Sequence, residues 1–570
     1  MTSPVSQQPD VLDEEVLIAG AGICGLTLAI QLRQTQPQLG VTVIDRANYP
    51  LPEATHKVGE SSVEVQAHYL RETLDLVDHL DNHQLRKFGL RMFLTHHDNS
   101  DIRSRVEYGQ VTHAPLPAYQ LDRGRLENYL KDHASHLGVR ILAGHRLRSL
   151  DLGEDELPHL ARVTGPGGPV HIRSRWFVDA TGRAGFLKRM LDLQQPVSHT
   201  ANASWLRIDH EIDVDTWSTD DQWRDRVPSG LRRLSTNHLM GRGYWVWLIP
   251  LASGATSVGI VADAAIHDHN TFNTLDGFLD WLKVREPQCA AELHENRDQI
   301  RDFRVMSDYA YSCQQVFSDR WFITGEAGVS IDPLYSSGGD LMAISNTLIT
   351  DLIGRASNGD EIVEQASAHN QLYLLLSQIW LVAYQDQYPL MGNAQVMVAK
   401  VIWDTIIYWA VPGLLHFQGV YPLLSERPAL LAGLYRTWEI HSRVQQFLRE
   451  WDTVDNPATQ DAFADPYSLM DFLVDLHTGM AADLTDTELA YQLDENVALL
   501  EHAAGQLLFV VTTRLLDHPD HAARAQASTW LEDPEVKHLI ERYHELDAST
   551  PMDPSWISLG RTGVPELVDG

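Results

Sequence analysis

A glycine-rich turn between a buried strand and a helix constrains this chain more than any other sequence feature. Residues 15–19 form an apolar run typical of a buried parallel strand. The turn Gly20-Ala21-Gly22-Ile23-Cys24-Gly25 follows directly and leads into an apolar helical stretch at 26–32. A second strand, 40–44, ends at Asp45, about 20 residues past the last glycine. Together these elements match the complete pattern of a dinucleotide-binding turn.

Each glycine of this turn has a physical role in binding a pyrophosphate. Gly20 allows the tight turn, Gly22 lets the backbone approach the phosphates, and Gly25 lets the helix and the strand close up. The unpaired N–H groups at the start of the helix then meet the phosphates. The sequence therefore predicts that this turn binds a dinucleotide cofactor.

The chain does not continue as a self-contained NAD-binding domain. After Arg46, a polar loop leads to residues 57–62 and a helix, where alternating strands and helices would be expected. Apolar strands that end in glycine turns return only at 176–183 and 321–328. This spacing indicates a nucleotide-binding fold that is split by a long insertion.

The insertion and the C-terminal part differ in pattern. Alternating residues at 203–208 and 255–261 predict a half-buried antiparallel sheet, suited to floor a pocket. From about 361 onward the pattern becomes helical. Such a split fold with a β-rich insertion resembles the flavoprotein monooxygenases. The resemblance implies an α/β protein with a split Rossmann-like FAD-binding domain, an inserted antiparallel β-sheet domain for the substrate, and a C-terminal helical region.

The predicted segments follow one another along the chain. They are a flexible tail at 1–12, an FAD-binding region at 13–195 with an inserted segment at about 51–115, a β-rich pocket insertion at 196–318, a return to the FAD-binding domain at 319–360, and a helical region at 361–570.

Composition excludes several function classes. The 77 Asp and Glu residues outnumber the 44 Lys and Arg residues, for a formal charge of −33, which disfavours nucleic-acid binding and anionic membrane surfaces. The three cysteines are far apart and form no metal-ligand pattern, so we expect no metal site and a reducing cytoplasmic location. The apolar stretch 405–424 is interrupted by Pro412 and Pro422, and we interpret it as buried helices and a turn rather than an integral membrane segment.

The insertion also contains a W-x-W-x-I-P string, Trp245 to Pro250. With the N-terminal glycine turn, it resembles the flavin-dependent halogenases of the phenol and pyrrole type, within the FAD-dependent monooxygenase-like superfamily. The resemblance spans roughly residues 14–360, because 57–62 and 332–338 also resemble family segments. It implies an enzyme that uses FAD reduced by a separate NAD(P)H-flavin reductase, O₂ and a halide ion to make hypohalous acid.

In this family a lysine delivers the halogen to an aromatic substrate. The resemblance implies Lys87, because 85–93 is similar to the lysine-plus-aromatic strand of the family. A nearby Arg86 and burial would both lower the pKa of the Lys87 ammonium and favour a reactive amine. Lys57 is the next candidate, although it lies in the segment expected to line the flavin. The alternative for Lys87 is a solvated lysine on a surface strand.

Two further groups of residues take roles from the resemblance. Trp245, Trp247 and Pro250 would form a partition between flavin and substrate, although tryptophans at period-2 spacing are also typical of an ordinary core. In the turn 332–339, Ser337 and Gly338 would bind the halide, and Ser336 would position the oxidant. The alternative is a plain turn that leads into a helix at 341–349.

The remaining cofactor contacts follow by position in the family pattern. Asp45 would accept hydrogen bonds from the adenosine ribose, and Glu326 replaces the aspartate usual at its position. The predicted cofactor-binding residues are Gly20, Gly22, Gly25, Asp45, Arg46, Ser61, Arg123, Asp179, Gly182, Gly325, Glu326 and Gly339. For Asp179 and Gly182 a plain strand-end turn is the alternative.

The expected substrate is a phenol or pyrrole of secondary metabolism, modified with chloride or bromide. Tyr335 stands where tryptophan-specific members carry a glutamate, so a carboxylate base is missing there. A free small aromatic molecule is favoured over one tethered to a carrier protein, since carrier proteins are usually acidic and so is this chain. Two alternatives stay open at this point: a flavin-dependent aromatic hydroxylase without halogenation, and a flavin-binding protein that has lost catalysis.

Overall fold

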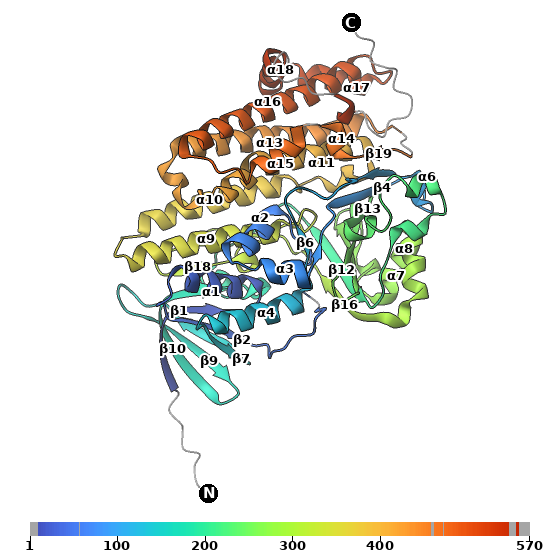
Figure 1. Ribbon diagram of the computed structural model, residues 1–570. Helices are drawn as coiled ribbons and strands as arrows, with labels where there is room; N and C mark the ends of the chain where they lie inside the picture. Colours follow the sequence, from blue (N-terminus) through green and yellow to red (C-terminus); the bar gives the residue numbers. More distant parts are fainter. Residues whose placement is uncertain (1–9, 56, 458–460, 471, 547–553, 558–570) are drawn as a thin grey trace. The chain divides into compact units, whose positions relative to one another are not determined.

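A computed structural model describes residues 10–55, 57–457, 461–470, 472–546 and 554–557 (Figure 1). The chain divides into two compact units. The first unit comprises residues up to His83, Leu121–Val197 and Ala310–Ser377. The second unit comprises Gln84–Gln120, Ser198–Tyr309 and the residues from Gln378 onward.

A seven-stranded sheet forms the centre of the first unit. Its strands run in the order β7-β2-β1-β10-β9-β8, and β18 also pairs with β10. β1 is parallel to both β2 and β10, and β18 is parallel to β10, whereas β8 and β9 are antiparallel. The bounds are β1 Asp10–Ala19, β2 Val41–Asp45, β7 Arg140–Ala143, β8 Arg146–Asp151, β9 His159–Gly165, β10 Gly168–Asp179 and β18 Trp321–Ile323.

The predicted strand–turn–helix–strand unit is present in this sheet. Helix α1, Ile23–Thr35, connects β1 to β2, and its residues 23–32 are almost all buried. It packs against α4, Arg123–His136, and α9, Ser337–Ser357. Because α1 is apolar all round, it lies between the sheet and other helices rather than at the surface.

The expected N-terminal tail requires a correction. Residues 10–12 belong to β1, where Asp10 lies opposite Val170 of β10 in parallel register. The acidic residues of this stretch do not suggest a strand, and they occur because the first half of β1 is exposed. Asp13 pairs with Arg173, which lies opposite it on β10. The rest of the predicted tail, 1–9, lies outside the described residues.

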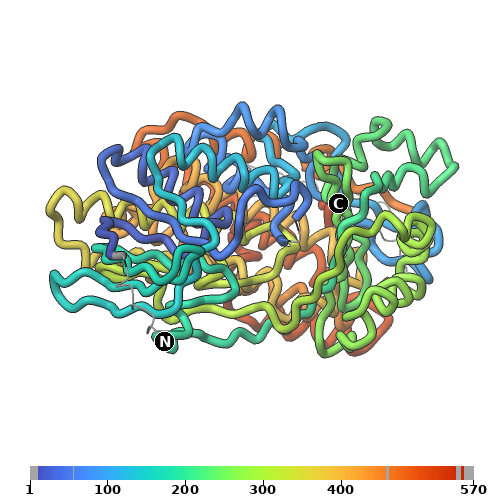
Figure 2. The backbone as a smooth tube through the Cα atoms, turned by 90° about the horizontal axis from the view of Figure 1, so that it is seen from below, coloured from blue at the N-terminus to red at the C-terminus, as the bar shows by residue number. Residues whose placement is uncertain are grey.

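An eight-stranded sheet forms the centre of the second unit. Its order is β16-β12-β15-β14-β13-β4-β5-β19. Figure 2 shows the blue segment with β4 and β5 alongside the green strands of the inserted region, and β4 joins β13 in parallel. The bounds are β4 Leu90–Leu94, β5 Val106–Tyr108, β12 Ala201–Ile208, β13 Thr236–Gly241, β14 Tyr244–Pro250, β15 Thr256–Asp263, β16 Ile300–Met306 and β19 Phe463–Ala464.

The prediction that this sheet is half-buried was wrong. All eight residues of β12 are buried, and so are seven of the eight residues of β15. Helices α7, Leu275–Arg285, and α8, Pro287–Glu295, contribute Phe278 and Leu293 to a core with the residues of one sheet face. Alternation in the sequence reflects two different buried faces here, one of them rich in tryptophan and polar side chains.

The C-terminal part is helical, as predicted. Its helices are α10 Val363–Val382, α11 Ala394–Tyr408, α12 Leu414–Phe417, α13 Pro428–Val454, α14 Pro466–Leu469, α15 Phe472–Gly479, α16 Asp486–Leu516, α17 His521–Trp530 and α18 Pro534–Leu546. The helical run Ala394–Phe417 is long and apolar enough to cross a membrane, but 89% of its most apolar window is buried inside the protein. The interpretation of 405–424 as buried helices and a turn is therefore confirmed.

The close contact between β14 and β15 gives a first prediction. Gly259 lies opposite Trp247, and a Cβ at Gly259 would stand 2.2 Å from the indole ring. Gly259→Ala must therefore displace the ring, at a cost of about 1–3 kcal/mol. We expect an apparent melting temperature lowered by at least about 2 °C in differential scanning calorimetry. Gly167→Ala, where a Cβ meets nothing within 4 Å, is the control; equal melting temperatures for the two variants would contradict the packing described here.

Candidate functional site

The glycine turn after β1 is shaped by close backbone packing. Gly20 has φ +115°, and a Cβ there would lie 2.2 Å from the carbonyl oxygen of Ala180. A Cβ at Gly25 would lie 1.9 Å from the carbonyl oxygen of Gly20. Any side chain at either position would force β1, α1 and the end of β10 apart.

Gly22 differs from the other two glycines, because a Cβ at this position meets nothing within 4 Å. Gly22 is the N-cap residue of α1, no side chain caps the helix, and the first turn contains no acidic residue. The helix N-terminus therefore presents its N–H groups and the positive end of its dipole to open space. This arrangement suits an anionic group such as a pyrophosphate.

Asp45 lies at the end of β2, beside this turn. Its carboxylate accepts hydrogen bonds from the backbone N–H groups of Ala21 at 2.6 Å and Ala47 at 2.7 Å. An ionised carboxylate accepts about four hydrogen bonds, so two sites are left for ribose hydroxyls. Asp45 is half-buried and the adjoining Arg46 is exposed.

Arg123 holds the segment that contains Ser61. Its guanidinium donates to the carbonyl oxygen of Val58 and, at 2.6 Å, to the carboxylate of Glu127. The same buried carboxylate pairs with Lys57, which is the second lysine considered as a relay. The Lys57 amine is thus part of an ion-pair network in the first unit. Ser61 is buried in this segment.

Asp179 is buried at the end of β10, and its carboxylate stabilises the turn that follows the strand. Its carboxylate accepts from the backbone N–H and the hydroxyl of Thr181, at 2.9 and 2.6 Å, and from the N–H of Leu187 at 2.7 Å. Burial raises the pKa of this carboxyl group. These bonds fit the strand-end alternative, and a direct cofactor contact by Asp179 or by Gly182, which has φ +59°, stays a prediction.

The loop after β18 carries Gly325 and Glu326. Gly325 has φ +61°, and the side chain of Glu326 is exposed among buried neighbours. The hydroxyl of Tyr311 donates to the carbonyl oxygen of Glu326 at 2.6 Å, and the Lys188 amine lies 3.1 Å from the centre of the Tyr311 ring. Burial lowers the pKa of Lys188 to about 8. Tyr311 therefore holds this loop by a hydrogen bond, and Lys188 packs against the Tyr311 ring. No sequence pattern indicated these contacts.

The turn 332–339 leads into helix α9. Ser336, its N-cap residue, has φ +58°, an unusual conformation for a residue with a side chain. A Cβ at Gly338 meets nothing within 4 Å, whereas one at Gly339 would lie 1.9 Å from the Gln66 amide oxygen. Backbone N–H groups at 337 and 338 are thus placed at the start of a 21-residue helix, beside open space. The turn suits an anion chemically, and halide binding by Ser337 and Gly338 stays a prediction.

Lys87 lies in the second unit and is only 4% exposed, so the alternative of a solvated surface lysine is wrong. It is not within a strand as expected. Residues 87–89 form a turn between β3, Leu85–Arg86, and β4. The Lys87 backbone N–H donates to the carbonyl oxygen of Ala118 at 2.8 Å. Arg86 is exposed and donates to the carbonyl oxygen of Ala114, so it faces solvent beside the buried lysine.

The two tryptophans of the W-x-W-x-I-P string lie on one face of β14. Both are buried, and their ring centres are 5.7 Å apart. Trp245 donates through its indole N–H to the Tyr388 hydroxyl at 2.8 Å, and Trp247 donates to the Ser257 hydroxyl at 3.1 Å. Pro250, at the end of the strand, is buried as well. These bonds fix both rings rigidly, as either a partition or a core requires.

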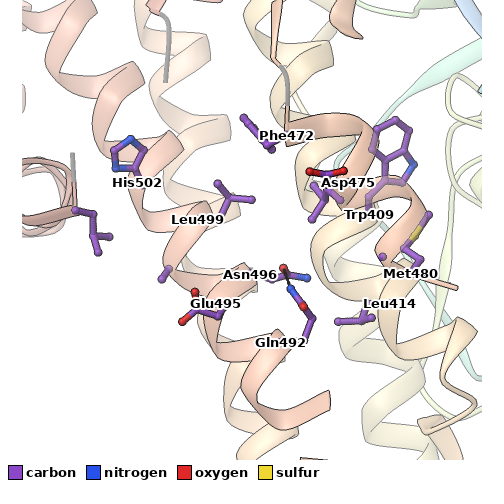
Figure 3. A pocket seen from close by; sticks show the side chains of 14 residues that line it. Trp409, Leu414, Phe472, Asp475, Met480, Gln492, Glu495, Asn496, Leu499 and His502 are labelled. Atoms are coloured by element: carbon purple, nitrogen blue, oxygen red, sulfur yellow. Dashed lines mark hydrogen bonds between the residues drawn. The ribbon is translucent and has the colours of Figure 1, made fainter. Parts of the chain in front are cut away.

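A separate cavity of about 490 Å³ lies in the C-terminal helical region (Figure 3). Its walls come from η10, Trp409–Gly413, from α15 and from α16, and they include Trp409, Asp475 and Asn496. The residues predicted for the site are not among those that line it. Figure 3 shows Leu499 and Asn496 of α16 on one side and Trp409 and Met480 on the other.

The first unit therefore has the fold and the turn of a protein that binds a dinucleotide cofactor. A parallel sheet, a helix N-terminus open at Gly22 and a half-buried acidic residue at the tip of β2 all fit such a ligand. The fit rests on the empty space at Gly22, which protein atoms leave unfilled while they fill the space at Gly20 and Gly25.

Comparison with known proteins identifies the family. The family described as tryptophan halogenase matches residues 83–371, about half of the chain. The chain belongs to the flavin-dependent halogenases, and it is an enzyme of the oxidoreductase type that uses FAD.

Individual relatives agree with this assignment. The chain is 25% identical over 451 residues to the flavin-dependent halogenase chlA of Dictyostelium discoideum, covering 72% of each chain. It is 25% identical over 250 residues to the 1H-pyrrole-2-carbonyl-(peptidyl-carrier protein) chlorinase of Pseudomonas fluorescens, covering 42% of this chain and 52% of that protein.

A solved structure shows the same fold. The halogenase PltM in complex with phloroglucinol and FAD superposes with a TM-score of 0.58 at 16% identity, covering 86% of this chain and 96% of that one. The predicted α/β class with a Rossmann-like FAD-binding domain is thus confirmed.

The contrast between Gly22 and its neighbours gives a second prediction. Gly22→Ala keeps an ordinary φ and meets no protein atom, so the protein folds normally, but the new methyl group occupies the space of the phosphates. We expect FAD affinity to fall at least about tenfold, since the N–H groups lose their close approach. Flavin fluorescence titration measures the affinity, and circular dichroism melts without added FAD report folding. Unchanged affinity with unchanged folding would show that FAD does not bind at this turn.

Proposed function

We propose that this enzyme installs chloride or bromide on an electron-rich aromatic molecule, a phenol or a pyrrole of secondary metabolism, and that Lys87 delivers the halogen. The observation that carries the proposal is the burial of Lys87 between β3 and β4 of the second unit, where its backbone N–H donates to the carbonyl oxygen of Ala118. Lysines are almost never fully buried unless they are paired, so a buried lysine has a defined place in the protein.

The other two buried lysines, Lys188 and Lys400, have defined contacts. All seven lysines lie within the described residues, and three of them are buried: Lys87, Lys188 and Lys400. Lys400 donates to the carbonyl oxygen of Ala383, to Asp404 and to Gln445, at 2.7 to 2.9 Å, which uses all three of its protons. Lys188 packs on Tyr311 beneath the Gly325–Glu326 loop. Lys87 is the buried lysine that also lies in the segment similar to the lysine-plus-aromatic strand of the family.

Bound reduced FAD, with O₂ and a halide, supplies hypohalous acid as the source of electrophilic halogen. The Lys87 amine holds this molecule by a hydrogen bond with its halogen toward the ring. A ring carbon attacks the halogen, the carbon–halogen bond forms as the halogen–oxygen bond breaks, and the released hydroxide combines with the ring proton as water. The sum is ArH + HOX → ArX + H₂O, in which the lysine is unchanged.

Tyr335 favours a substrate that activates itself. It stands half-buried in the turn 332–339, at the position where tryptophan-specific relatives have a carboxylate. Phenols and pyrroles carry an electron-donating atom in or on the ring and need less help from a base. The pyrrole-2-carbonyl chlorinase and the phloroglucinol-bound halogenase act on or bind rings of these kinds, which supports the same class for this chain.

We propose a free aromatic substrate and a separate flavin reductase as partners. The net charge of −33 opposes encounter with an acidic carrier protein. A pyrrole on a carrier is the second candidate, because the Pseudomonas relative uses one. We also place the enzyme in the reducing cytoplasm, which fits a chain with only three, widely spaced cysteines.

Replacement of Lys87 tests the proposed reaction. The purified enzyme would be given FAD, NADH, a flavin reductase, O₂ and chloride or bromide, with a panel of free phenols and pyrroles and one carrier-bound pyrrole. Lys87→Met should lower halogenated product by at least about 100-fold, as loss of a positioned hydrogen-bonding group does. Hypohalous acid trapped by taurine in solution should persist.

Lys283→Met, at an exposed lysine of the same unit, is the matched control and should keep full product. Products that gain one oxygen and no halogen would assign the chain to aromatic hydroxylation instead. Full halogenation by Lys87→Met would remove Lys87 from the reaction.

A further inference from the structure

A fully buried ion network in the second unit includes Arg91, four positions after Lys87 in the sequence. Arg91 of β4 and Arg232 both pair with the carboxylate of Glu107 on β5, and all three side chains are 0% exposed. The Arg232–Glu107 distance is 2.8 Å, and Arg232 also reaches Asp215 at 2.8 Å. Burying such charges costs considerable desolvation energy, and apolar residues often stabilise a core as well or better. Stability alone therefore does not explain this network.

Two chain segments enclose the turn 87–89. On one side, the Gln110 side chain lies against Gly89, where a Cβ would be 2.6 Å from its amide oxygen. On the other side, Phe88 donates its N–H to the carbonyl oxygen of Leu234 at 3.0 Å, and Thr236 donates its N–H to the carbonyl oxygen of Gly89 at 3.0 Å. The turn that carries Lys87 is thus held between the Gln110 segment and residues 234–236.

The ion network binds both enclosing segments. Arg91 donates to the carbonyl oxygen of Gln110 at 2.5 Å and, on the other side, to the Ser235 hydroxyl at 3.4 Å. Its guanidinium lies 5.9 Å from the centre of the Phe88 ring. Arg232 precedes the second segment, and its carbonyl oxygen accepts from the Asn237 amide at 2.9 Å. Glu107 joins the two arginines and so connects the two sides.

We infer that Glu107 is a positioning residue for Lys87: by holding Arg91 and Arg232 together, it fixes the two segments that enclose the lysine turn and thereby the place where the halogen is delivered. The inference rests on the proposed function of Lys87. Carboxylates and guanidiniums suit this task, since their paired bonds are directional and fix orientation as well as distance.

The consequence is a specific defect. When the turn loosens, hypohalous acid is still formed, but the amine no longer holds it at the ring, so it escapes into solution. Misplacement of reacting groups by 1 Å costs up to about 100-fold in rate. The ratio of halogenated product to escaped hypohalous acid therefore reports positioning, whereas a general loss of folded protein lowers both quantities together.

Glu107→Gln tests the inference, because it keeps the shape of the side chain and removes its charge. We expect the ratio of aromatic product to taurine-trapped hypohalous acid to fall at least about tenfold, with the sum of the two within about twofold of the unchanged enzyme. Glu107→Asp, which keeps the charge on a shorter arm, should recover part of the ratio. Reactions run well below the melting temperature of each variant.

Glu286→Gln is the matched control. Glu286 forms an equally buried pair with Arg105 in the same unit, at 2.6 Å and with both side chains 2% exposed, and it also accepts from Tyr244. Its replacement should lower stability comparably and leave the ratio unchanged. Equal ratios for Glu107→Gln and Glu286→Gln would overturn the inference.

Asp215→Asn provides a second test of the network if the Glu107 variants fail to fold. Asp215 pairs with the same Arg232 but its side chain is 13% exposed, so its replacement is milder, and we expect a smaller fall of the ratio in the same direction. An unchanged ratio would again contradict the inference. Lys87→Met in the same assay separates the two claims: if it keeps the full ratio, the proposed role of Lys87 fails, whatever Glu107 does.

Discussion

The enclosure of a lysine inside protein is the constraint on which the account of this enzyme depends. An amine in water meets hypohalous acid at random, whereas a buried amine can hold one molecule beside one ring. The lysine side chain is long and has many rotamers, so holding its amine in one place costs conformational entropy. A backbone fixed by hydrogen bonds limits the positions that the amine can reach. In this chain the support comes from hydrogen bonds on both sides of the turn 87–89 and from the Arg91–Glu107–Arg232 network.

In the proposed reaction the two units have different tasks. The first unit offers a helix N-terminus and an acidic residue that suits a ribose, as a dinucleotide requires, and Gly20 and Gly25 are needed because backbone atoms occupy the space of a Cβ. The second unit offers a buried lysine, two fixed tryptophans and strands β12, β14 and β15, which are buried almost throughout. A rigid surround suits delivery of a reactive halogen, since a mobile site would release it before reaction.

Much of the first unit could be predicted from sequence, because the glycine turn depends on local contacts. Gly20, Gly22, Gly25 and Asp45 lie within 26 positions of one another, and each position has a distinct steric or electrostatic reason. The family was predicted for a similar reason, since W-x-W-x-I-P occupies a single strand.

The errors arose where distant segments meet. β1 begins in an exposed polar stretch that becomes a strand because it pairs with β10, which is more than 150 positions away in the sequence. The sequences of β12 and β15 alternate between apolar and polar residues, yet both strands are buried. Helices α7 and α8 cover one face, and this cover cannot be inferred from the strand sequences alone. The inferred support of Lys87 involves Arg232, and the Gly325–Glu326 loop lies against Tyr311 and Lys188. Lys87 and Arg232, and likewise Lys188 and Gly325, are more than a hundred positions apart, which no local pattern encodes.

A structure of the enzyme with FAD and a phenol substrate bound tests the central claim most directly. The distance to measure is that from the Lys87 amine to the ring carbon that becomes halogenated. The account predicts a gap that a single hypohalous acid molecule bridges, with protein between the flavin ring and the substrate. A ring in open contact with the flavin and out of reach of the Lys87 amine would contradict it.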